Sequence, residues 1–321
     1  MNFKSKIIVL FLFFSCSIVS AQLVKKHGQL SVKGTQLVDI NHNPIVLRGV
    51  SFGWHNWWGK FYNKEVVKTL HNDWNATVLR AAMGVDADKN CYIKSPEDSK
   101  AKIEAVINEA INQDIYVIID FHSHNIHLKE AKVFFDEMSK KYGKYPHIIY
   151  EVFNEPDNET WAEVKAYSEE VIKVIRANDP KNIILVGSPH WDQDVHLAAK
   201  DPIVGFDNLM YTMHFYAGTH GKWLRDRTDE ALIKGLPIFV SESAGMEASG
   251  DGPLNLIAWQ AYVDWMEKNK ISWITWSVSD KKETCSFLKE NANTSGKWKD
   301  TDLQESGLIT GEYLRKYNAK H

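Results

Sequence analysis

The chain has 321 residues, of which 44% are hydrophobic, 25% charged and 12% aromatic, which is typical of a folded globular protein and excludes a disordered or disulfide-knotted chain. Its formal net charge of -3 gives no electrostatic reason to expect nucleic acid or an anionic membrane as a partner. The 12 tryptophans are unusual, because tryptophan offers a large flat apolar face that serves both in cores and in ligand stacking.

The first 21 residues have the pattern of a secretory signal peptide. Lys4 and Lys6 precede an apolar run over residues 7–14, and small residues follow up to Val19-Ser20-Ala21. This run is shorter than the roughly 20 apolar residues that span a bilayer, and no later run is long enough for a transmembrane helix. We therefore expect cleavage after Ala21, a secreted or periplasmic protein, and a single domain over residues 22–321.

Two alternatives exist for this segment. The apolar run could be a buried first strand or helix, or Cys16 could carry a lipid anchor, although Phe13 stands where a lipoprotein would have Leu. After cleavage Cys91 and Cys285 are left, and in an exported protein these two could form a disulfide.

Eight short apolar runs follow along the chain. They are nearly continuous in apolar residues, as strands buried on both faces must be. The runs are Ile45–Ser51, Thr77–Met83, Ile115–Phe121, Ile148–Phe153, Ile183–Gly187, Leu209–Tyr216, Pro237–Glu242 and Ser272–Ser277.

Segments with helical periodicity separate these runs. They are Glu65–Leu70, Lys100–Asn112, Lys129–Tyr142, Trp161–Asn178, a shorter segment around Asp192–Lys200, Lys222–Lys234, Leu254–Lys268 and Gly307–Tyr317. Strands that alternate with helices pair in parallel through right-handed crossovers, so the fold class is α/β and eight such units predict a (β/α)₈ TIM barrel. A doubly wound open sheet is the competitor, but no Gly-x-Gly-x-x-Gly follows the first strand. Residues 28–44, with a turn at Gly34, predict a small β-hairpin at the bottom of the barrel.

Polar and aromatic residues occur at the ends of six of these runs. A barrel builds its active site at the carboxyl ends of its strands, and buried charges need a partner or a ligand. The residues at these ends are Arg80, His122, Asn154, Glu155, His214, Tyr216, Glu242 and Trp276.

Glu155 and Glu242 follow strands four and seven, which lie roughly across a barrel from each other. Two facing carboxyls are what glycoside hydrolysis requires, one to protonate the leaving oxygen and one to attack the anomeric carbon. We expect Arg80 to keep Glu242 ionised, Tyr216 to donate to it, and Asn154 to hold a sugar 2-hydroxyl. Glu155 would need a raised pKa to stay protonated. Alternatively, the two glutamates belong to unrelated ion pairs.

At these residues the chain resembles glycoside hydrolase family 5, the retaining endo-β-1,4-glucanases, from about Gly28 to Gly307. The segments that carry the resemblance are Leu79-Arg80-Ala81-Ala82-Met83, Ile149-Tyr150-Glu151-Val152-Phe153-Asn154-Glu155-Pro156 and Met213-His214-Phe215-Tyr216-Ala217-Gly218-Thr219-His220-Gly221. Relatives usually have an aromatic residue and Gly after the nucleophile, whereas here Glu242 is followed by Ser243-Ala244-Gly245.

The resemblance implies a role for each site residue. Glu155 is implied as acid/base and Glu242 as nucleophile, supported by Arg80, Asn154, His214 and Tyr216. His122 and Trp276 are implied at the sugar beside the cleavage point, Lys281 and Glu283 at the next sugar on the non-reducing side, and Trp57 and Trp191 as stacking platforms. No cofactor is implied, and the partner is a β-glucan polysaccharide or oligosaccharide that a monomer would bind.

Several alternatives stay open. His122, His124 and His127 could form a metal site, but no further ligand cluster completes it, so we expect none. Trp161, Trp259 and Trp265 lie on helical stripes and are assigned to the core, while Trp54, Trp57, Trp58, Trp191, Trp223 and Trp276 are candidates for the cleft. Rival functions are a β-mannanase, a mixed-linkage or xyloglucan-active enzyme on the same barrel, and a non-catalytic polysaccharide-binding barrel.

Overall fold

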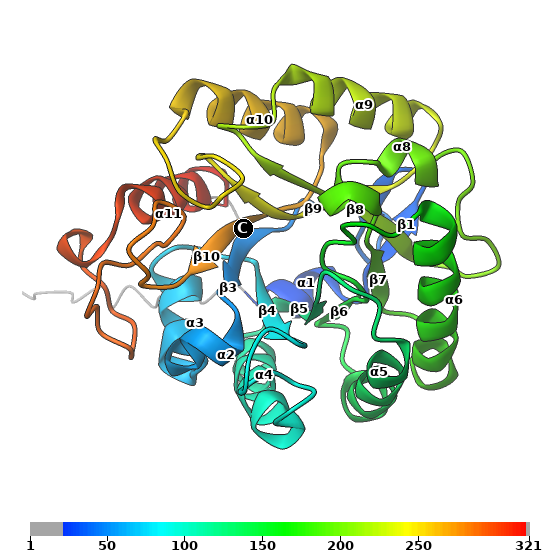
Figure 1. The fold of residues 1–321 in the computed structure, drawn as a ribbon, viewed down its shortest axis with the longest axis horizontal. Coiled ribbons are helices and arrows are strands. Elements are labelled where there is room, and N and C mark those ends of the chain that lie inside the picture. Colours follow the sequence, from blue (N-terminus) through cyan, green and yellow to red (C-terminus); the bar gives the residue numbers. More distant parts are fainter. Residues whose placement is uncertain (1–21, 319–321) are drawn as a thin grey trace, which may run out of the picture.

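A computed structural model describes residues 22–318, so the predicted signal peptide and Cys16 lie outside the described residues. Eight parallel strands close into a barrel in the order β10-β3-β4-β5-β6-β7-β8-β9, and helices surround it (Figure 1). The strands are β3 (Arg48–Phe52), β4 (Val78–Gly84), β5 (Tyr116–His122), β6 (Ile148–Glu151), β7 (Ile183–Val186), β8 (Leu209–Tyr216), β9 (Ile238–Ala244) and β10 (Trp273–Val278). The predicted (β/α)₈ barrel is confirmed, and the open doubly wound sheet was the wrong alternative.

Every residue of the eight barrel strands is buried, which explains why the sequence shows them as unbroken apolar runs. Their ends were predicted less well. The fourth run continues to Phe153, but β6 ends at Glu151, because a buried loop after a strand is as apolar as the strand itself.

The longer helices lie where the periodicity predicts them. They are α3 (Lys64–Asn72), α4 (Pro96–Asn112), α5 (Leu128–Tyr142), α6 (Trp161–Asn178), α9 (Lys222–Ile233), α10 (Leu256–Asn269) and α11 (Glu305–Tyr317). Their starts carry ordinary caps: Asn63 accepts from two backbone N–H groups of α3, and Thr160 and Glu163 form a capping box on α6.

The fifth crossover is irregular and consists of two single turns, α7 (Pro189–Asp192) and α8 (Val195–Ala198). Other short elements left no periodic pattern in the sequence. These are α1 (Leu23–His27), α2 (His55–Trp58) and two 3₁₀ turns, Gly59–Phe61 and Asp300–Asp302.

The predicted hairpin is present as β1 (Ser31–Lys33) and β2 (Gln36–Val38), joined at Gly34 with φ of 61°. The Val32 N–H donates to Asn208 Oδ1 at 3.0 Å, directly before β8 begins. The hairpin therefore caps the amino ends of the strands and leaves the carboxyl ends open.

Cys91 and Cys285 are both buried free thiols, so the disulfide that the sequence allows is not formed. None of the helices within residues 22–318 is long and apolar enough to cross a membrane.

Candidate active site

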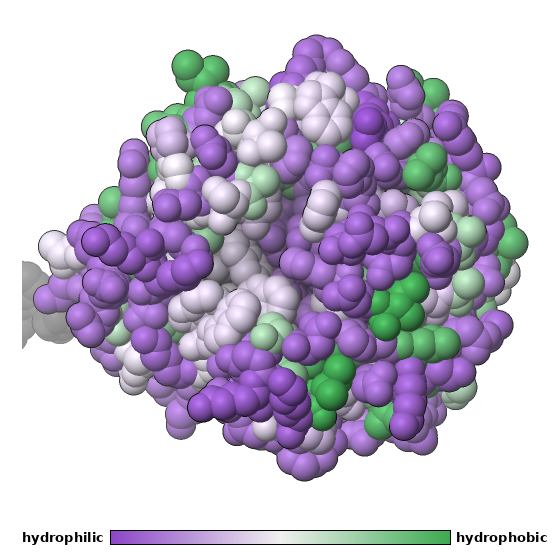
Figure 2. Space-filling view, in the orientation of Figure 1, coloured by the Kyte–Doolittle hydropathy of each residue, from purple (hydrophilic) through white to green (hydrophobic). Residues whose placement is uncertain are grey.

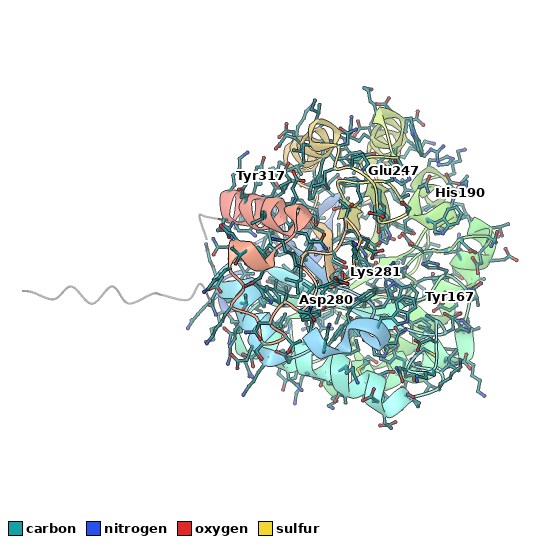
Figure 3. The ribbon with its side chains drawn as sticks, turned by 60° about the vertical axis from the view of Figure 1, so that its left-hand side comes forward. Tyr167, His190, Glu247, Asp280, Lys281 and Tyr317 are labelled. Carbon is teal, nitrogen blue, oxygen red and sulfur yellow. The ribbon has the colours of Figure 1, made fainter. Side chains whose placement is uncertain are left out.

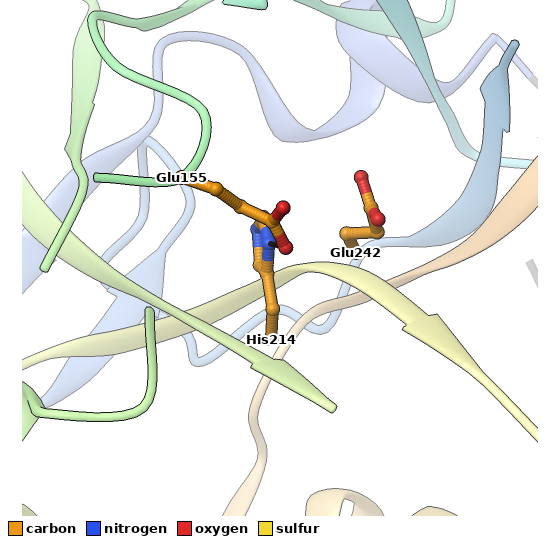
Figure 4. Close-up of side chains that lie close together, drawn as sticks. All are labelled: Glu155, His214 and Glu242. Atoms are coloured by element: carbon orange, nitrogen blue, oxygen red, sulfur yellow. Dashed lines mark hydrogen bonds and ion pairs between the residues drawn. The ribbon is translucent and has the colours of Figure 1, made fainter. Parts of the chain in front are cut away.

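The two predicted catalytic carboxylates face each other at the carboxyl ends of the strands. Glu242 lies on β9, and Glu155 lies in the loop that leaves β6. One carboxylate oxygen of each lies within 4.8 Å of the other, and the His214 ring lies beside the Glu155 carboxyl (Figure 4). The face drawn in Figure 2 is hollowed near its centre, and side chains of intermediate hydropathy line the recess.

Both oxygens of Glu242 have hydrogen-bond partners. Arg80 Nη1 donates to Oε2 at 2.9 Å, and the Tyr216 hydroxyl donates to Oε1 at 2.6 Å. These contacts stabilise the negative charge and fix the orientation of the carboxylate, as a nucleophile requires.

Arg80 is fully buried and organises the base of the site. Its Nε donates to Glu151 at 2.6 Å, and its Nη2 donates to Asn154 Oδ1 at 2.6 Å and lies 3.0 Å from Asp120 Oδ2. Burial lowers the pKa of Arg80, but the surrounding carboxylates outweigh it and raise this pKa well above its usual value. The guanidinium therefore stays charged.

Glu155 contacts two histidines. His214 Nδ1 lies 2.9 Å from Oε1, and His124 Nε2 lies 3.3 Å from Oε2. Burial raises the pKa of Glu155, but the hydrogen bonds from these two histidines outweigh it and hold the pKa below its usual value. The expectation of a raised pKa on Glu155 was therefore wrong, because the sequence does not show that two imidazoles meet this carboxylate.

The ring of His214 holds the proton that Glu155, with its lowered pKa, does not hold by itself. Burial lowers the pKa of its ring, but Asp192, Glu151 and Glu155 outweigh burial and raise the pKa well above its usual value. Glu155 and His214 therefore keep a proton between them at neutral pH, across the 2.9 Å contact.

His122 and Trp276 stack with ring centroids 5.2 Å apart and planes 5° from parallel. His122 Nδ1 lies 2.6 Å from Asp120 Oδ2, which leaves Nε2 for a ligand. Burial and the Arg80 charge lower the pKa of His122 well below its usual value, so the ring is neutral. Ala82, Tyr216, Ala244, Met246, Trp276 and Cys285 form a small buried cluster, separate from the main core. Ser243, which follows Glu242, is buried, and its hydroxyl donates to the Ile274 carbonyl at 2.8 Å.

The remaining predicted binding residues lie on the outer loops. Trp57 on α2 is 48% exposed, and its indole N–H donates to Asp88; Trp191 on α7 is 41% exposed. Lys281 and Glu283 form an ion pair in the loop after β10, where Lys281 stands beside Asp280 (Figure 3). None of these side chains forms a hydrogen bond or ion pair with Glu155 or Glu242 within residues 22–318.

The three histidines proposed as an alternative metal site have separate partners. His122 pairs with Asp120, His124 with Glu155, and His127 with Asp86 at 2.7 Å. His124 therefore supports Glu155. Within residues 22–318, the single group with donor atoms close enough for a cation is Glu155, His214 and Glu242. All three are engaged in the hydrogen bonds described above.

Three buried carboxylates of the site were not predicted, namely Asp120, Glu151 and Asp192. Asp120 and Glu151 stand inside apolar strands, and that misplaced charge was the signal that could have identified them. Asp192 lies in the irregular fifth crossover, where no periodicity marks it.

The sequence profile of the family described as cellulase (glycosyl hydrolase family 5) matches residues 38–282. An endoglucanase of Clostridium saccharobutylicum is 44% identical over 289 residues, covering 88% of this chain and 64% of its own. Endoglucanase A of Evansella cellulosilytica is 45% identical over 282 residues, covering 85% of this chain and 57% of its own. The chain thus spans less than two thirds of the length of these two relatives.

Among solved structures, the catalytic domain of Thermobifida fusca endoglucanase Cel5A in complex with cellotetraose is similar at a TM-score of 0.86. It is 30% identical in sequence, and the match covers 91% of this chain and 99% of that domain. The fold, the profile and the identities agree over most of the chain, which belongs to the cellulase family, glycosyl hydrolase family 5.

Proposed function

We propose that this protein is an endo-β-1,4-glucanase that cleaves internal glucosidic bonds with retention of configuration. The observation that carries the proposal is the pair of facing carboxylates, whose oxygens approach within 4.8 Å. Retaining enzymes hold their two carboxyl groups about 5–5.5 Å apart, whereas inverting enzymes need roughly 6.5–9.5 Å to admit a water.

In the first step, a Glu242 oxygen attacks the anomeric carbon as the bond to the leaving sugar breaks. Glu155 transfers a proton to that departing oxygen, and the chain fragment leaves as an alcohol. Water then attacks the anomeric carbon and gives its proton to Glu155, and the bond to Glu242 breaks. No metal or cofactor takes part in either step.

Asn154 supports recognition of the sugar at the reacting centre. Its Oδ1 accepts from Arg80, while its buried Nδ2 has no hydrogen-bond partner among the described residues. That free amide N–H is suited to a sugar hydroxyl or to the nucleophile, since a buried donor without a partner is costly.

The aromatic side chains support a glucan as substrate. Sugar rings present flat apolar faces, for which Trp276 beside the carboxylates and the exposed Trp57 and Trp191 are suitable platforms. Lys281 and Glu283 add charged hydrogen-bonding groups at one end. The domain from Thermobifida fusca, crystallised with cellotetraose, is a relative that binds this kind of chain.

The test is the hydrolysis of a panel of soluble polysaccharides. We expect the viscosity of carboxymethyl-cellulose to fall faster than reducing ends appear, with little hydrolysis of mannan or xyloglucan. Glu242→Gln should lower kcat by roughly 10⁴-fold or more, as loss of a nucleophile does. Glu155→Ala should lower it by about 10²–10⁴-fold on unactivated chains.

Preferred hydrolysis of mannan, xyloglucan or a mixed-linkage glucan would contradict the substrate assignment. Tight binding of cellulose chains without turnover, unchanged in Glu242→Gln, would support the non-catalytic barrel. Lys132→Met, on the outer surface, is the matched control for both variants.

We further propose that the protein is exported and acts as a monomer. The export signal is the segment that ends at Val19-Ser20-Ala21, and anchoring through Cys16 is the lesser alternative. A mature amino terminus at Gln22 and a monomeric mass in solution would support this proposal.

A further inference from the structure

Asp192 is a fully buried carboxylate that the reaction described above does not use. Its Oδ1 accepts from the Ser188 N–H at 2.5 Å, and its Oδ2 accepts from the Thr212 hydroxyl at 2.5 Å. The same Oδ2 lies 3.3 Å from His214 Nε2. The opposite nitrogen of that ring is the one that meets Glu155.

The backbone that carries Asp192 is in an unfavourable conformation. His190, Trp191 and Asp192 have φ values of 62°, 54° and 59°, and L-residues with a Cβ avoid this left-handed region. The Trp191 N–H donates to the carbonyl of Pro156, the residue after Glu155, at 2.9 Å. The turn therefore exposes the Trp191 ring, directs the Asp192 carboxylate inward and contacts the acid/base loop.

The surroundings of His214 Nε2 decide which ring nitrogen carries a proton. Nε2 lies 2.8 Å from the Ser241 hydroxyl, 3.3 Å from Asp192 and 3.9 Å from Glu151 Oε1. Carboxylates accept hydrogen bonds and do not donate them when ionised, so a proton on Nε2 is favoured. Nδ1 is then the nitrogen that shares a proton with Glu155.

We infer that Asp192 is a positioning residue for the acid/base step: its carboxylate holds a proton on His214 Nε2, so that Nδ1 shares the proton that Glu155 transfers. This inference rests on the proposed function. During turnover the transferred proton moves from Glu155 to the leaving oxygen and returns from water, while Asp192 neither gains nor loses one. Burial raises the pKa of Asp192 well above its usual value. We assign the ionised form from the geometry, because Oδ1 faces the Ser188 N–H and Oδ2 faces the Thr212 hydroxyl and His214 Nε2.

Other charged groups also act on His214. They are Glu151 from β6, Glu155 from the loop after β6, Asp120 from β5, Glu242 from β9 and His220 from the loop after β8. Among the carboxylates, Asp192 differs in that it contacts neither Arg80 nor the carboxylate across the site, so its charge can be removed without disturbing the nucleophile.

The test is the pH profile of kcat/KM for Asp192→Asn on cello-oligosaccharides. Loss of the negative charge makes the proton shared by Glu155 and His214 easier to remove, so we expect the basic limb to move down by about one pH unit. The rate loss should be at least fivefold larger on cello-oligosaccharides than on 2,4-dinitrophenyl β-cellobioside, whose leaving group needs no protonation.

Thr212→Val is the matched control, because it removes a hydrogen bond to the same carboxylate but keeps its charge. Its basic limb should move by less than a third of the shift in Asp192→Asn. Equal shifts in the two variants, an unshifted limb in Asp192→Asn, or equal losses on both substrates would overturn the inference.

A second measurement needs no variant. The ¹⁵N spectrum of histidine-labelled wild-type protein should show His214 Nε2 protonated between pH 5 and 9. A neutral ring with its proton on Nδ1 would overturn the inference. Absence of any β-1,4-glucanase activity in the wild type would instead refute the proposed function.

Discussion

At the base of the site a single guanidinium, that of Arg80, faces the carboxylates of Asp120, Glu151 and Glu242. The sequence predicted Arg80 and Glu242 because both stand at the mouth end of apolar strands. It did not predict the other two, because a carboxylate within an apolar strand looks the same whether its partner is an arginine or a ligand. The residue types thus indicated that carboxylates and an arginine form the site. Which carboxylates contact Arg80 depended on the geometry of the barrel.

Replacing Arg80 by Met should destabilise the fold as well as abolish activity. The substitution leaves three buried carboxylates without their cation, and breaking a buried pair costs about 3–5 kcal/mol. The free energy of unfolding in urea measures the effect. Lys132→Met removes an ion pair between half-exposed side chains, Lys132 and Glu170, and should cost less than about 1 kcal/mol. Similar losses for the two variants would contradict the role of Arg80.

At the scale of elements, the barrel strands and long helices were predictable and the loops were not. Continuous apolar runs identify β3 to β10, and 3.6-residue periodicity identifies helices such as α6. The turn at residues 190–192 was not predictable, because none of its residues is the glycine or asparagine that usually marks a positive φ. Asp192 was missed for the same reason.

The close contact between β3 and β4 requires glycine at position 49. A Cβ on Gly49 would lie 1.7 Å from the carbonyl oxygen of Val78, which is backbone and cannot move aside. Gly49→Ala should therefore cost about 3 kcal/mol or more of unfolding free energy, at the upper end for overpacking. At Gly221 the nearest atom to a Cβ is Trp223 Cδ1 at 3.5 Å, so Gly221→Ala should cost only the exchange of glycine at the N-cap of α9, about 1 kcal/mol or less. A near-neutral Gly49→Ala would show that the two strands can separate.

At the scale of the whole molecule, the 12 tryptophans divide between the core and the mouth. Trp259 and Trp161 are buried and Trp265 is partly buried, as their helical spacing predicted. Trp57, Trp191 and Trp223 are exposed on α2, α7 and α9, near the starts of the segments that follow β3, β7 and β8. A near-neutral surface with aromatic platforms suits an uncharged polymer with flat rings. Composition could exclude charged partners, but which tryptophans line the cleft depended on loop geometry.

In the proposed mechanism, Glu242 and Glu155 act across the mouth of the barrel as nucleophile and acid/base, with retention of configuration. The most direct measurement is ¹H NMR of the anomeric protons during early hydrolysis of cellopentaose. We expect the β-anomer of the new reducing end to appear first and the α-anomer to form later, by mutarotation. Initial release of the α-anomer would contradict this mechanism, because inversion needs a water between the two carboxylates and a wider separation than the structure has.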